Sequence, residues 1–380
     1  MIPFNKPYLT GRETQYIQEA VQSGKISGNG LFTAKCHRYF KKEFGFPDVF
    51  LTTSCTDALE MAALLIDTGP GDEIIMPSYT FVSTANAFVL RGARIVFADS
   101  MEQSPHLDPD QIESVITPKT KAIVPVHYAG IACDMGRIMS LAERHGLFVI
   151  EDSAQSINSY YRTQPLGSIG HFGAFSFHET KNVIAGEGGL LAVNDGRFSK
   201  RAEIIWEKGT NRAEFFRGEV KKYEWVDLGS SYLPSELTAA FLYAQLEHLE
   251  EIQARRRAIW ERYYSELQIL AHAERLRLPL IPDYATNNGH LFYLVCRDLP
   301  ERDGLLAHLL EKGILAVFHY LSLHTSPFFR SRHDGRELPW SDYYSQRLVR
   351  LPLFFELTDE QVSHIIQSVL EYFSVSYPAS

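Results

Sequence analysis

Two charged residues in the first half of the chain follow short apolar runs, at positions where enzymes keep reactive groups. Residues 147–155 read LFVIEDSAQ, so a buried strand of the parallel type ends at Asp152. Residues 172–177 form a second apolar run, and Lys181 follows it in the sequence HETKN. Ligand crevices of α/β sheets lie at the carboxyl ends of strands, so these patterns predict that a lysine and a carboxylate share one crevice.

The chemistry that a strand-end lysine offers is Schiff-base formation with a carbonyl group, because desolvation lowers its pKa and makes the amine a better nucleophile. Taken alone, Lys181 is better interpreted as a solvated lysine at a turn, since most lysines are exposed. The presence of Asp152 reverses this interpretation. Pyridoxal phosphate enzymes pair their Schiff-base lysine with an aspartate that keeps the pyridine nitrogen protonated, which makes the ring an electron sink.

The elements that position these residues alternate between strands and helices. Four apolar runs between residues 49 and 126 precede the strand that ends at Asp152, and helical patterns separate them. This alternation predicts a doubly wound, largely parallel sheet. No GxGxxG motif follows the first strand, so a dinucleotide-binding fold is not supported. Residues 236–267 are expected to form one long helix, either straight or bent, which connects the sheet to a smaller domain.

The motifs EDSAQ, SFHETKN and GEGG together resemble the DegT/DnrJ/EryC1/StrS sugar aminotransferases. The resemblance extends over nearly the whole chain, and the three motifs combined are far more specific than any one of them. It implies an α/β, fold-type I transferase like aspartate aminotransferase, with a large domain at 1–245 and a smaller C-terminal α+β domain at 246–380. It also implies pyridoxal 5′-phosphate as cofactor, with Lys181 and Asp152 as catalytic residues.

A small polar cluster, Ser54, Cys55 and Thr56, lies between an expected strand and a helix that begins near Asp57. A helix N-terminus offers free N–H groups and the positive end of a dipole, which makes it an anion site. Simple N-capping explains one hydroxyl equally well. The family usually has Ser-Gly-Thr here and binds the cofactor phosphate with it. Cys55 replaces the glycine, which preserves the backbone contacts only if its φ is negative.

Further cofactor contacts are implied by the resemblance. Phe81 matches the residue that the family stacks on pyridoxal, although its pattern alone favours a place in the core. Gln155 corresponds to a residue beside the ring, near its phenolic oxygen, and Ser176 to one that binds the phosphate. Many members have Gly-Tyr-Asn-Tyr-Arg where this chain has GSSYL at 229–233. Their asparagine reaches the neighbouring subunit's phosphate, and Ser231 offers a shorter side chain for that contact.

Two regions are candidates for substrate binding. Residues 209–229 are polar and aromatic and are expected to form a long loop, which is either a solvated excursion or a functional segment. Its candidates for substrate contact are Asn211, Arg212 and Lys222. Residues 319–324 read HYLSLH and resemble the family's His-Tyr-x-x-x-His pattern near the substrate, which points to His319, Tyr320 and His324. No acidic or cysteine partner is close to these histidines in sequence, so no metal site is expected.

Composition limits the other functional classes. The chain has 380 residues, of which 45% are hydrophobic and 22% charged, as in ordinary globular proteins. A net charge of −9 argues against a nucleic-acid surface. The four cysteines are scattered without a CxxC pair, so neither a metal site nor a disulfide framework is expected. No signal peptide or membrane-spanning run is recognised, and a cytoplasmic location is expected.

The resemblance implies amino transfer to a nucleotide-linked keto sugar by a homodimer with shared active sites. The run MPSYTFVSTANAFVLRGA is most similar, within the family, to enzymes of enterobacterial common antigen synthesis that make dTDP-4-amino-4,6-dideoxygalactose. The expected substrates are therefore dTDP-4-keto-6-deoxy-D-glucose and L-glutamate. Three alternatives stay open: a transaminase that gives the 4-epimer or a 3-amino sugar, a sugar dehydratase that would have histidine in place of Lys181, and a pyridoxal-binding protein without turnover.

Overall fold

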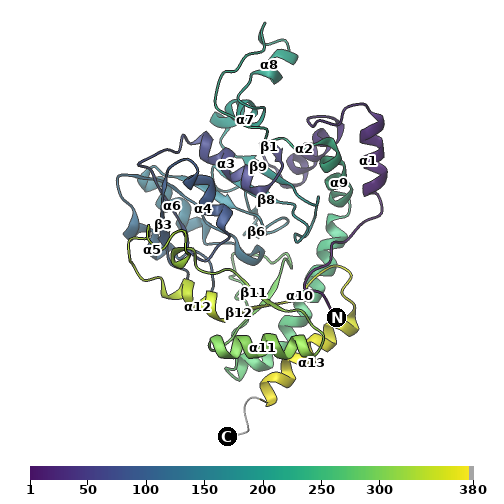
Figure 1. The fold of residues 1–380 in the computed structure, drawn as a ribbon, viewed down its shortest axis with the longest axis vertical. Coiled ribbons are helices and arrows are strands. Elements are labelled where there is room, and N and C mark those ends of the chain that lie inside the picture. The colour runs from purple at the N-terminus through teal and green to yellow at the C-terminus, as the bar shows by residue number, and fades with distance from the viewer. Residues whose placement is uncertain (376–380) are drawn as a thin grey trace.

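A seven-stranded sheet forms the centre of the larger part of the molecule (Figure 1). The computed structural model describes residues 1–375. The strands of the seven-stranded sheet lie in the spatial order β1-β9-β8-β5-β4-β2-β3. They are β1 (Asp48–Thr52), β9 (Gly189–Val193), β8 (Phe172–Ser176), β5 (Phe148–Asp152), β4 (Thr120–Ile123), β2 (Glu73–Pro77) and β3 (Arg94–Ala98). Only β9 is antiparallel to its neighbours, so the predicted, largely parallel sheet is confirmed.

Helices cover both faces of this sheet because successive strand residues point to opposite sides. In β2, Ile74 and Met76 pack against one layer of helices, whereas Ile75 packs against the other. The first layer contains α3 (Cys55–Leu65), α4 (Val82–Val89) and α7 (Ser199–Trp206). The opposite face is covered by α1 (Glu13–Gln22), α2 (Leu31–Phe44), α5 (Pro109–Val115), α6 (Met135–His145) and α9 (Glu236–Leu246).

The long helix expected between the two parts, straight or bent, is interrupted in the structure, which has two helices there. Helix α9 ends at Leu246, and α10 (Leu249–His272) begins after a non-helical His248, with φ −110° and ψ 12°. Helix α9 packs with the large sheet, whereas the later turns of α10 pack in a separate core. The two helices thus serve two different cores, although no glycine or proline marks the break in the sequence.

A second, three-stranded antiparallel sheet has the order β10-β12-β11, and its strands are β10 (Phe292–Val295), β12 (Leu348–Leu351) and β11 (Val317–Phe318). Helices α11 (Leu299–Glu311) and α13 (Asp359–Val375) pack on it, and α12 (Pro339–Arg347) leads into β12. Sequence patterns did not predict α12 or β12. This sheet lies below the large one in Figure 1, within the segment 246–380 that the sequence assigns to a smaller domain.

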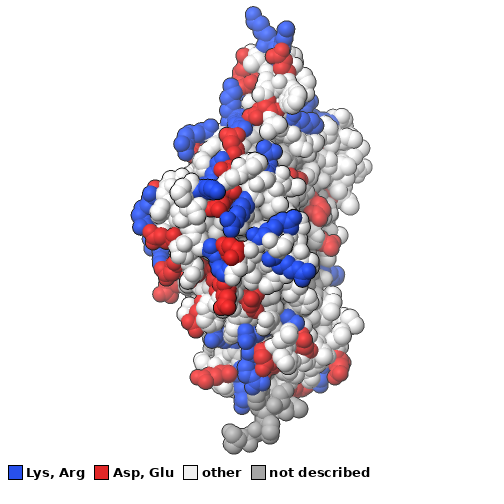
Figure 2. Space-filling model, turned by 60° about the vertical axis from the view of Figure 1, so that its left-hand side comes forward, with Lys and Arg blue, Asp and Glu red and all other residues white. Residues whose placement is uncertain are grey.

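Residues 209–229 project from the large sheet at the top of Figure 1, and we call them the arm. The expected loop contains a short helix, α8 (Arg212–Phe216). The side chains of Phe216 and Trp225 are 72% and 78% exposed. Acidic and basic side chains are interspersed over the face in Figure 2, with basic groups at the tip of the arm. No helix within residues 1–375 is long and apolar enough to cross a membrane.

Candidate active site

A cavity of about 990 Å³ lies where the carboxyl ends of β1, β5 and β8 meet segments of the smaller sheet. It contains both the lysine and the aspartate that the sequence singled out. Of the predicted site residues, those that line it are Ser54, Cys55, Thr56, Phe81, Asp152, Gln155, Ser176, Lys181, His319 and Tyr320. The fold therefore gathers residues that are up to 266 positions apart in the chain, from Ser54 to Tyr320, around one space.

The remaining predicted residues lie elsewhere in this chain. His324 accepts or donates a hydrogen bond at Ser78 Oγ, 2.8 Å from its Nδ1, and its ring is buried outside the cavity. Arg212 lies in the arm and forms an ion pair at 3.1 Å with Glu207, which precedes the arm. Asn211 and Lys222 are also arm residues, and Ser231 follows the arm in a bridge to Glu207. None of these five side chains lines the cavity of its own subunit.

The N-terminus of α3 forms a cradle at one end of the cavity. Ser54 is the N-cap, and its hydroxyl accepts the N–H of Asp57 at 3.1 Å. Among the described residues, no protein acceptor receives the N–H groups of Cys55 and Thr56, which leaves them free for an anion. Cys55 begins the helix with a negative φ, so the backbone geometry tolerates it in place of glycine.

Gly189 explains why β9 can approach this cradle so closely. A Cβ atom at Gly189 would lie 2.3 Å from the Ser54 carbonyl carbon and 2.5 Å from the Cys55 nitrogen. Any side chain there would push the helix N-terminus away from the sheet. The last glycine of the GEGG motif is thus required by packing against the cradle, and it is not a turn residue, because it already belongs to β9.

Asp152 is the last residue of β5, and it is 6% exposed. Its Oδ2 accepts a hydrogen bond from the Thr84 hydroxyl at 2.7 Å, and its Oδ1 accepts the N–H of Ala154 at 3.2 Å. Burial raises the pKa of Asp152, whereas these two donors and the nearby Lys181 favour the ionised form. The site therefore holds a carboxylate whose unused acceptor capacity faces the cavity.

Lys181 lies in the turn after β8, where its backbone N–H donates to the carbonyl of His178 at 2.9 Å. Burial lowers the pKa of its ammonium group, and the negative charge of Asp152 partly opposes that effect. Among the described residues, the Lys181 ammonium has no hydrogen-bond or ion-pair partner. A desolvated amine without a fixed partner is suited to attack a carbonyl group.

Aromatic groups form the wall between these two residues and the smaller sheet. Gln155 donates from Nε2 to the Tyr320 hydroxyl at 3.1 Å, and its Oε1 accepts the N–H of Ala129 at 2.6 Å. Tyr320 stacks on His319, with ring centroids 3.6 Å apart. Phe81 is 55% exposed, which excludes the core position that its pattern alone favoured. Its ring is 6.1 Å from that of Tyr320, and both border the cavity.

Arg350, on β12, is a cavity residue that sequence reasoning missed. Its Nη2 donates to the carbonyl of Phe318 at 3.2 Å, and its guanidinium lies over the ring of Phe4. Within residues 1–375, its buried Nε has no hydrogen-bond partner. Burial lowers the pKa of Arg350, and the nearby Tyr128, Tyr320 and Tyr79 partly oppose that effect. Because β12 was not recognised, the RLPLF sequence gave no indication that this arginine faces the site.

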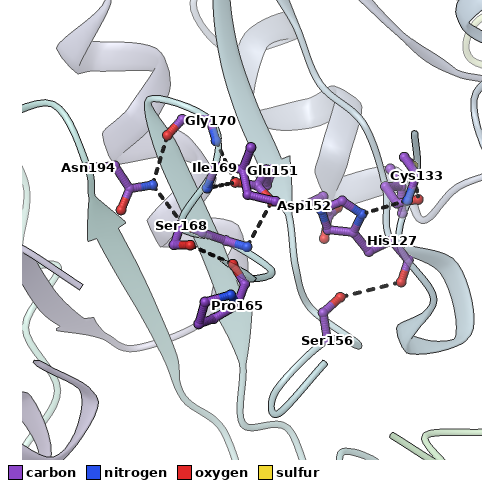
Figure 3. Close-up of polar contacts among 12 residues, drawn as sticks. His127, Cys133, Glu151, Asp152, Ser156, Pro165, Ser168, Ile169, Gly170 and Asn194 are labelled. Carbon is purple, nitrogen blue, oxygen red and sulfur yellow. Dashed lines mark hydrogen bonds and ion pairs between the residues drawn. The ribbon is translucent and has the colours of Figure 1, made fainter. Parts of the chain in front are cut away.

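The neighbouring Glu151 does not line the cavity, and its side chain lies beside Ile169 and Gly170 (Figure 3). Its carboxylate accepts N–H groups of Gly167, Ile169 and Gly170 at 2.8, 2.7 and 2.6 Å. It also pairs with the fully buried His127 at 2.9 Å. One carboxylate thus holds a turn and a neighbouring strand end in place, which gives Glu151 a structural role.

Replacing Glu151 with alanine is expected to reduce the free energy of unfolding by about 3–5 kcal/mol, because the buried donors lose their shared acceptor. Urea unfolding followed by circular dichroism measures this change. Glu113→Ala, which removes an exposed glutamate from the ion pair with Arg144, is the control and should change stability by less than about 1 kcal/mol. Equal effects of the two substitutions would contradict the anchoring role.

A comparison with protein families agrees with this geometry. The model of the DegT/DnrJ/EryC1/StrS aminotransferase family matches residues 7–370. The chain belongs to this family. The sequence motifs had suggested the same assignment, and the match covers both sheets and all the residues that line the cavity after Asn5.

Individual family members are similar over the whole chain. The spore coat polysaccharide biosynthesis protein SpsC of Bacillus subtilis is 32% identical over 97% of this chain and 96% of its own. The aminotransferase TlmJ of Streptoalloteichus hindustanus has a TM-score of 0.91 at 29% identity, covering 99% of this chain and all of its own. A sugar aminotransferase from Streptococcus pneumoniae, Spr1654 in its PLP form, has a TM-score of 0.91 at 26% identity, and it also covers 99% of this chain and all of its own. The expected fold-type I architecture is confirmed.

Proposed function

We propose that this sugar aminotransferase transfers the amino group of L-glutamate to C4 of dTDP-4-keto-6-deoxy-D-glucose. The products are dTDP-4-amino-4,6-dideoxy-D-galactose and 2-oxoglutarate. The observation that carries the proposal is the meeting of Lys181, Asp152 and the α3 cradle in one cavity. The similarity to a polysaccharide biosynthesis protein supports a sugar as the amino acceptor.

The cofactor is pyridoxal phosphate, and the residues present fit it. The free N–H groups of Cys55 and Thr56 suit its phosphate, and the exposed ring of Phe81 suits one face of its pyridine. The carboxylate of Asp152 suits the pyridine nitrogen, and Lys181 suits its aldehyde. Ser176 and Gln155 would contact the phosphate and the phenolic oxygen. When bound, the cofactor supplies an electron sink for the carbon that loses a proton.

The chain's own groups then divide the work of amino transfer. The Lys181 Nζ removes the proton from Cα of the amino donor, and in the second half of the reaction it delivers a proton to C4 of the sugar. Asp152 keeps the proton on the pyridine nitrogen. Tyr320 and His319 also line the cavity, where they orient the substrate and exclude water.

Arg350 supports a donor that carries a carboxylate. A partly buried guanidinium with an unsatisfied Nε is costly, and a bound carboxylate would supply the missing charge and hydrogen bonds. Replacing Arg350 with glutamine is expected to raise the KM for L-glutamate about 10- to 100-fold, as for a lost charged hydrogen bond. Separate stopped-flow measurements of the two half-reactions check this. The rate at which the aminated form of the variant aminates the sugar should stay within a few-fold of the wild-type rate. A selective loss of rate in that half-reaction would contradict the assignment.

The experiment that tests the proposed function is product analysis. Purified protein is incubated with dTDP-4-keto-6-deoxy-D-glucose and L-glutamate, and the nucleotide sugar is examined by NMR. A C4 amine with the galacto configuration is expected. A C4 amine with the gluco configuration, a C3 amine or a dehydrated sugar would each replace the proposal with one of the alternatives.

The arm supports a homodimer with shared active sites. Its aromatic side chains are exposed in the single chain, and Arg212, Lys222 and Ser231 lie outside their own cavity. A second copy of the chain would cover the aromatics and receive these polar groups at its own cavity. The substrate diphosphate needs such local positive charge, because the net charge of the chain is −9.

Complementation between inactive variants checks the shared site. Subunits with Lys181→Ala are mixed with subunits that carry Arg212→Ala, Lys222→Ala and Ser231→Ala together. Recovery of about a quarter of wild-type activity is expected if mixed dimers form statistically, because half of the dimers then contain one intact site. A mixture that exchanges subunits, as native mass spectrometry would show, but recovers no activity would refute sharing.

A further inference from the structure

Asp152 receives its only side-chain hydrogen bond within residues 1–375 from Thr84, near the N-terminus of α4. The Thr84 oxygen is in turn 2.9 Å from the Thr80 hydroxyl. The direction of this pair follows from chemistry. An ionised carboxylate can only accept, so the Thr84 proton points to Asp152, and the proton between the two threonines must come from Thr80.

Thr84 does not use its hydroxyl to stabilise its own helix. The N-cap position belongs to Phe81, which makes no side-chain cap, and the backbone N–H of Thr84 bonds to the Phe81 carbonyl at 3.2 Å. Both threonine side chains are buried, with exposed fractions of 0% for Thr84 and 1% for Thr80. Their hydroxyls bond to each other and form a two-step chain that ends on the carboxylate.

The need for this chain comes from the burial of Asp152. Removing a carboxylate from water favours its neutral form, and a neutral acid could not balance a positive charge on the pyridine nitrogen. A hydroxyl that donates to Oδ2 stabilises the ionised form and fixes the plane of the carboxylate. The same short segment, 80–84, contains Phe81. One turn of the chain therefore positions both the aromatic ring proposed to contact the pyridine face and the hydroxyl that bonds to Asp152.

We propose that Thr84 is a positioning residue that keeps Asp152 ionised and correctly oriented, and that Thr80 acts through Thr84 by orienting its hydroxyl. This inference rests on the proposed role of Asp152 toward the cofactor. It does not depend on which sugar is aminated, so it can be tested with the cofactor and L-glutamate alone.

The test compares Thr84→Val, which has nearly the same shape, with Thr84→Ser, which keeps the hydroxyl. Thr84→Val is expected to slow the L-glutamate half-reaction about 10- to 100-fold, the effect of one hydrogen bond to a charged group. It should also weaken pyridoxal phosphate binding to the apoprotein. Since the pKa of Asp152 would rise without its donor, the acid limb of the pH profile should move to higher pH.

Thr84→Ser should restore most of each property. Thr80→Val should change them in the same direction but less, and it should have no further effect in the Thr84→Val background. Thr68→Val is the matched control, because the Thr68 hydroxyl is buried without a partner among residues 1–375 and lies outside the cavity. It should leave the half-reaction, the cofactor affinity and the acid limb unchanged.

Wild-type values for Thr84→Val, or equal defects in Thr84→Ser and Thr84→Val, would overturn the proposal. If circular dichroism shows that Thr84→Val does not fold, the test uses Thr80→Val instead. An acid limb of the pH profile that is unshifted in Thr80→Val would then overturn the proposal. A wild-type protein that binds the cofactor but aminates no keto sugar would refute the proposed function, while the cofactor titrations would still decide the role of Thr84.

Discussion

Lys181→Ala is expected to abolish amino transfer, with a loss of about 10⁴-fold or more, because one side chain serves both as the covalent anchor and as the proton carrier. The half-buried position of Lys181, in the same cavity as Asp152, is the physical basis of both roles. The absorbance of the lysine-bound cofactor should disappear together with turnover. Borohydride reduction of the wild-type protein, followed by peptide mapping, should place the cofactor label on Lys181.

Lys119→Ala is a suitable control, because Lys119 is an exposed lysine at a turn far from the cavity. It should keep the absorbance and the activity of the wild type. A borohydride label on any lysine other than Lys181 would contradict the assignment. So would a Lys181→Ala variant that retains multiple turnovers, since no other lysine lines the cavity within the described residues.

Asp152→Asn is expected to retain part of the cofactor affinity but to lose activity by about 10²- to 10³-fold, as when an electrostatic partner is removed from a desolvated site. A neutral amide cannot hold the proton on the pyridine nitrogen, whereas it can preserve the hydrogen bond from Thr84. Cofactor titration and steady-state kinetics measure the two effects separately. Near-normal turnover would exclude the role of a charge partner.

The pH dependence gives a second measurement on the same residue. Burial raises the pKa of Asp152, so its ionised form should disappear on acidification at a higher pH than for an exposed aspartate. Activity that requires the carboxylate should therefore fall as the pH decreases through that value. The Asp152→Asn variant has no group to titrate there, and the corresponding limb of its profile should be flat.

The sequence predicted the centre of the site because both catalytic side chains follow strand ends, and parallel strands bring their carboxyl ends to one edge. Each of those strands is short, apolar and bounded by polar residues, which makes the pattern local and recognisable. The cradle at Ser54 followed from the same logic, since a strand leads directly into a helix. In these cases the neighbours in sequence determine where the side chain points.

Other features could not be predicted because they depend on contacts between distant segments. Arg350 faces the cavity only because β12 pairs with β10 and β11, and four-residue strands carry little signal. The break at His248 reflects two separate cores and has no local marker. In the sequence Thr84 has the pattern of an ordinary helical residue, because its contact with Asp152 exists only where the fold places β5 beside α4. His324 looked like a substrate ligand, but Ser78 holds its ring away from the cavity.

The alternation of side chains at the end of β5 has a genetic consequence. Glu151 and Asp152 are adjacent codons, yet one carboxylate faces the buried turn at Ile169 and the other faces the cavity. In a mutational scan, substitutions at codon 151 should reduce how much protein accumulates in the cell while the surviving molecules work normally. Substitutions at codon 152 should leave abundance nearly constant and remove the activity per molecule. Two neighbouring codons with the same chemical type would thus produce phenotypes of different kinds, one suppressible by a stabilising second-site mutation and the other not.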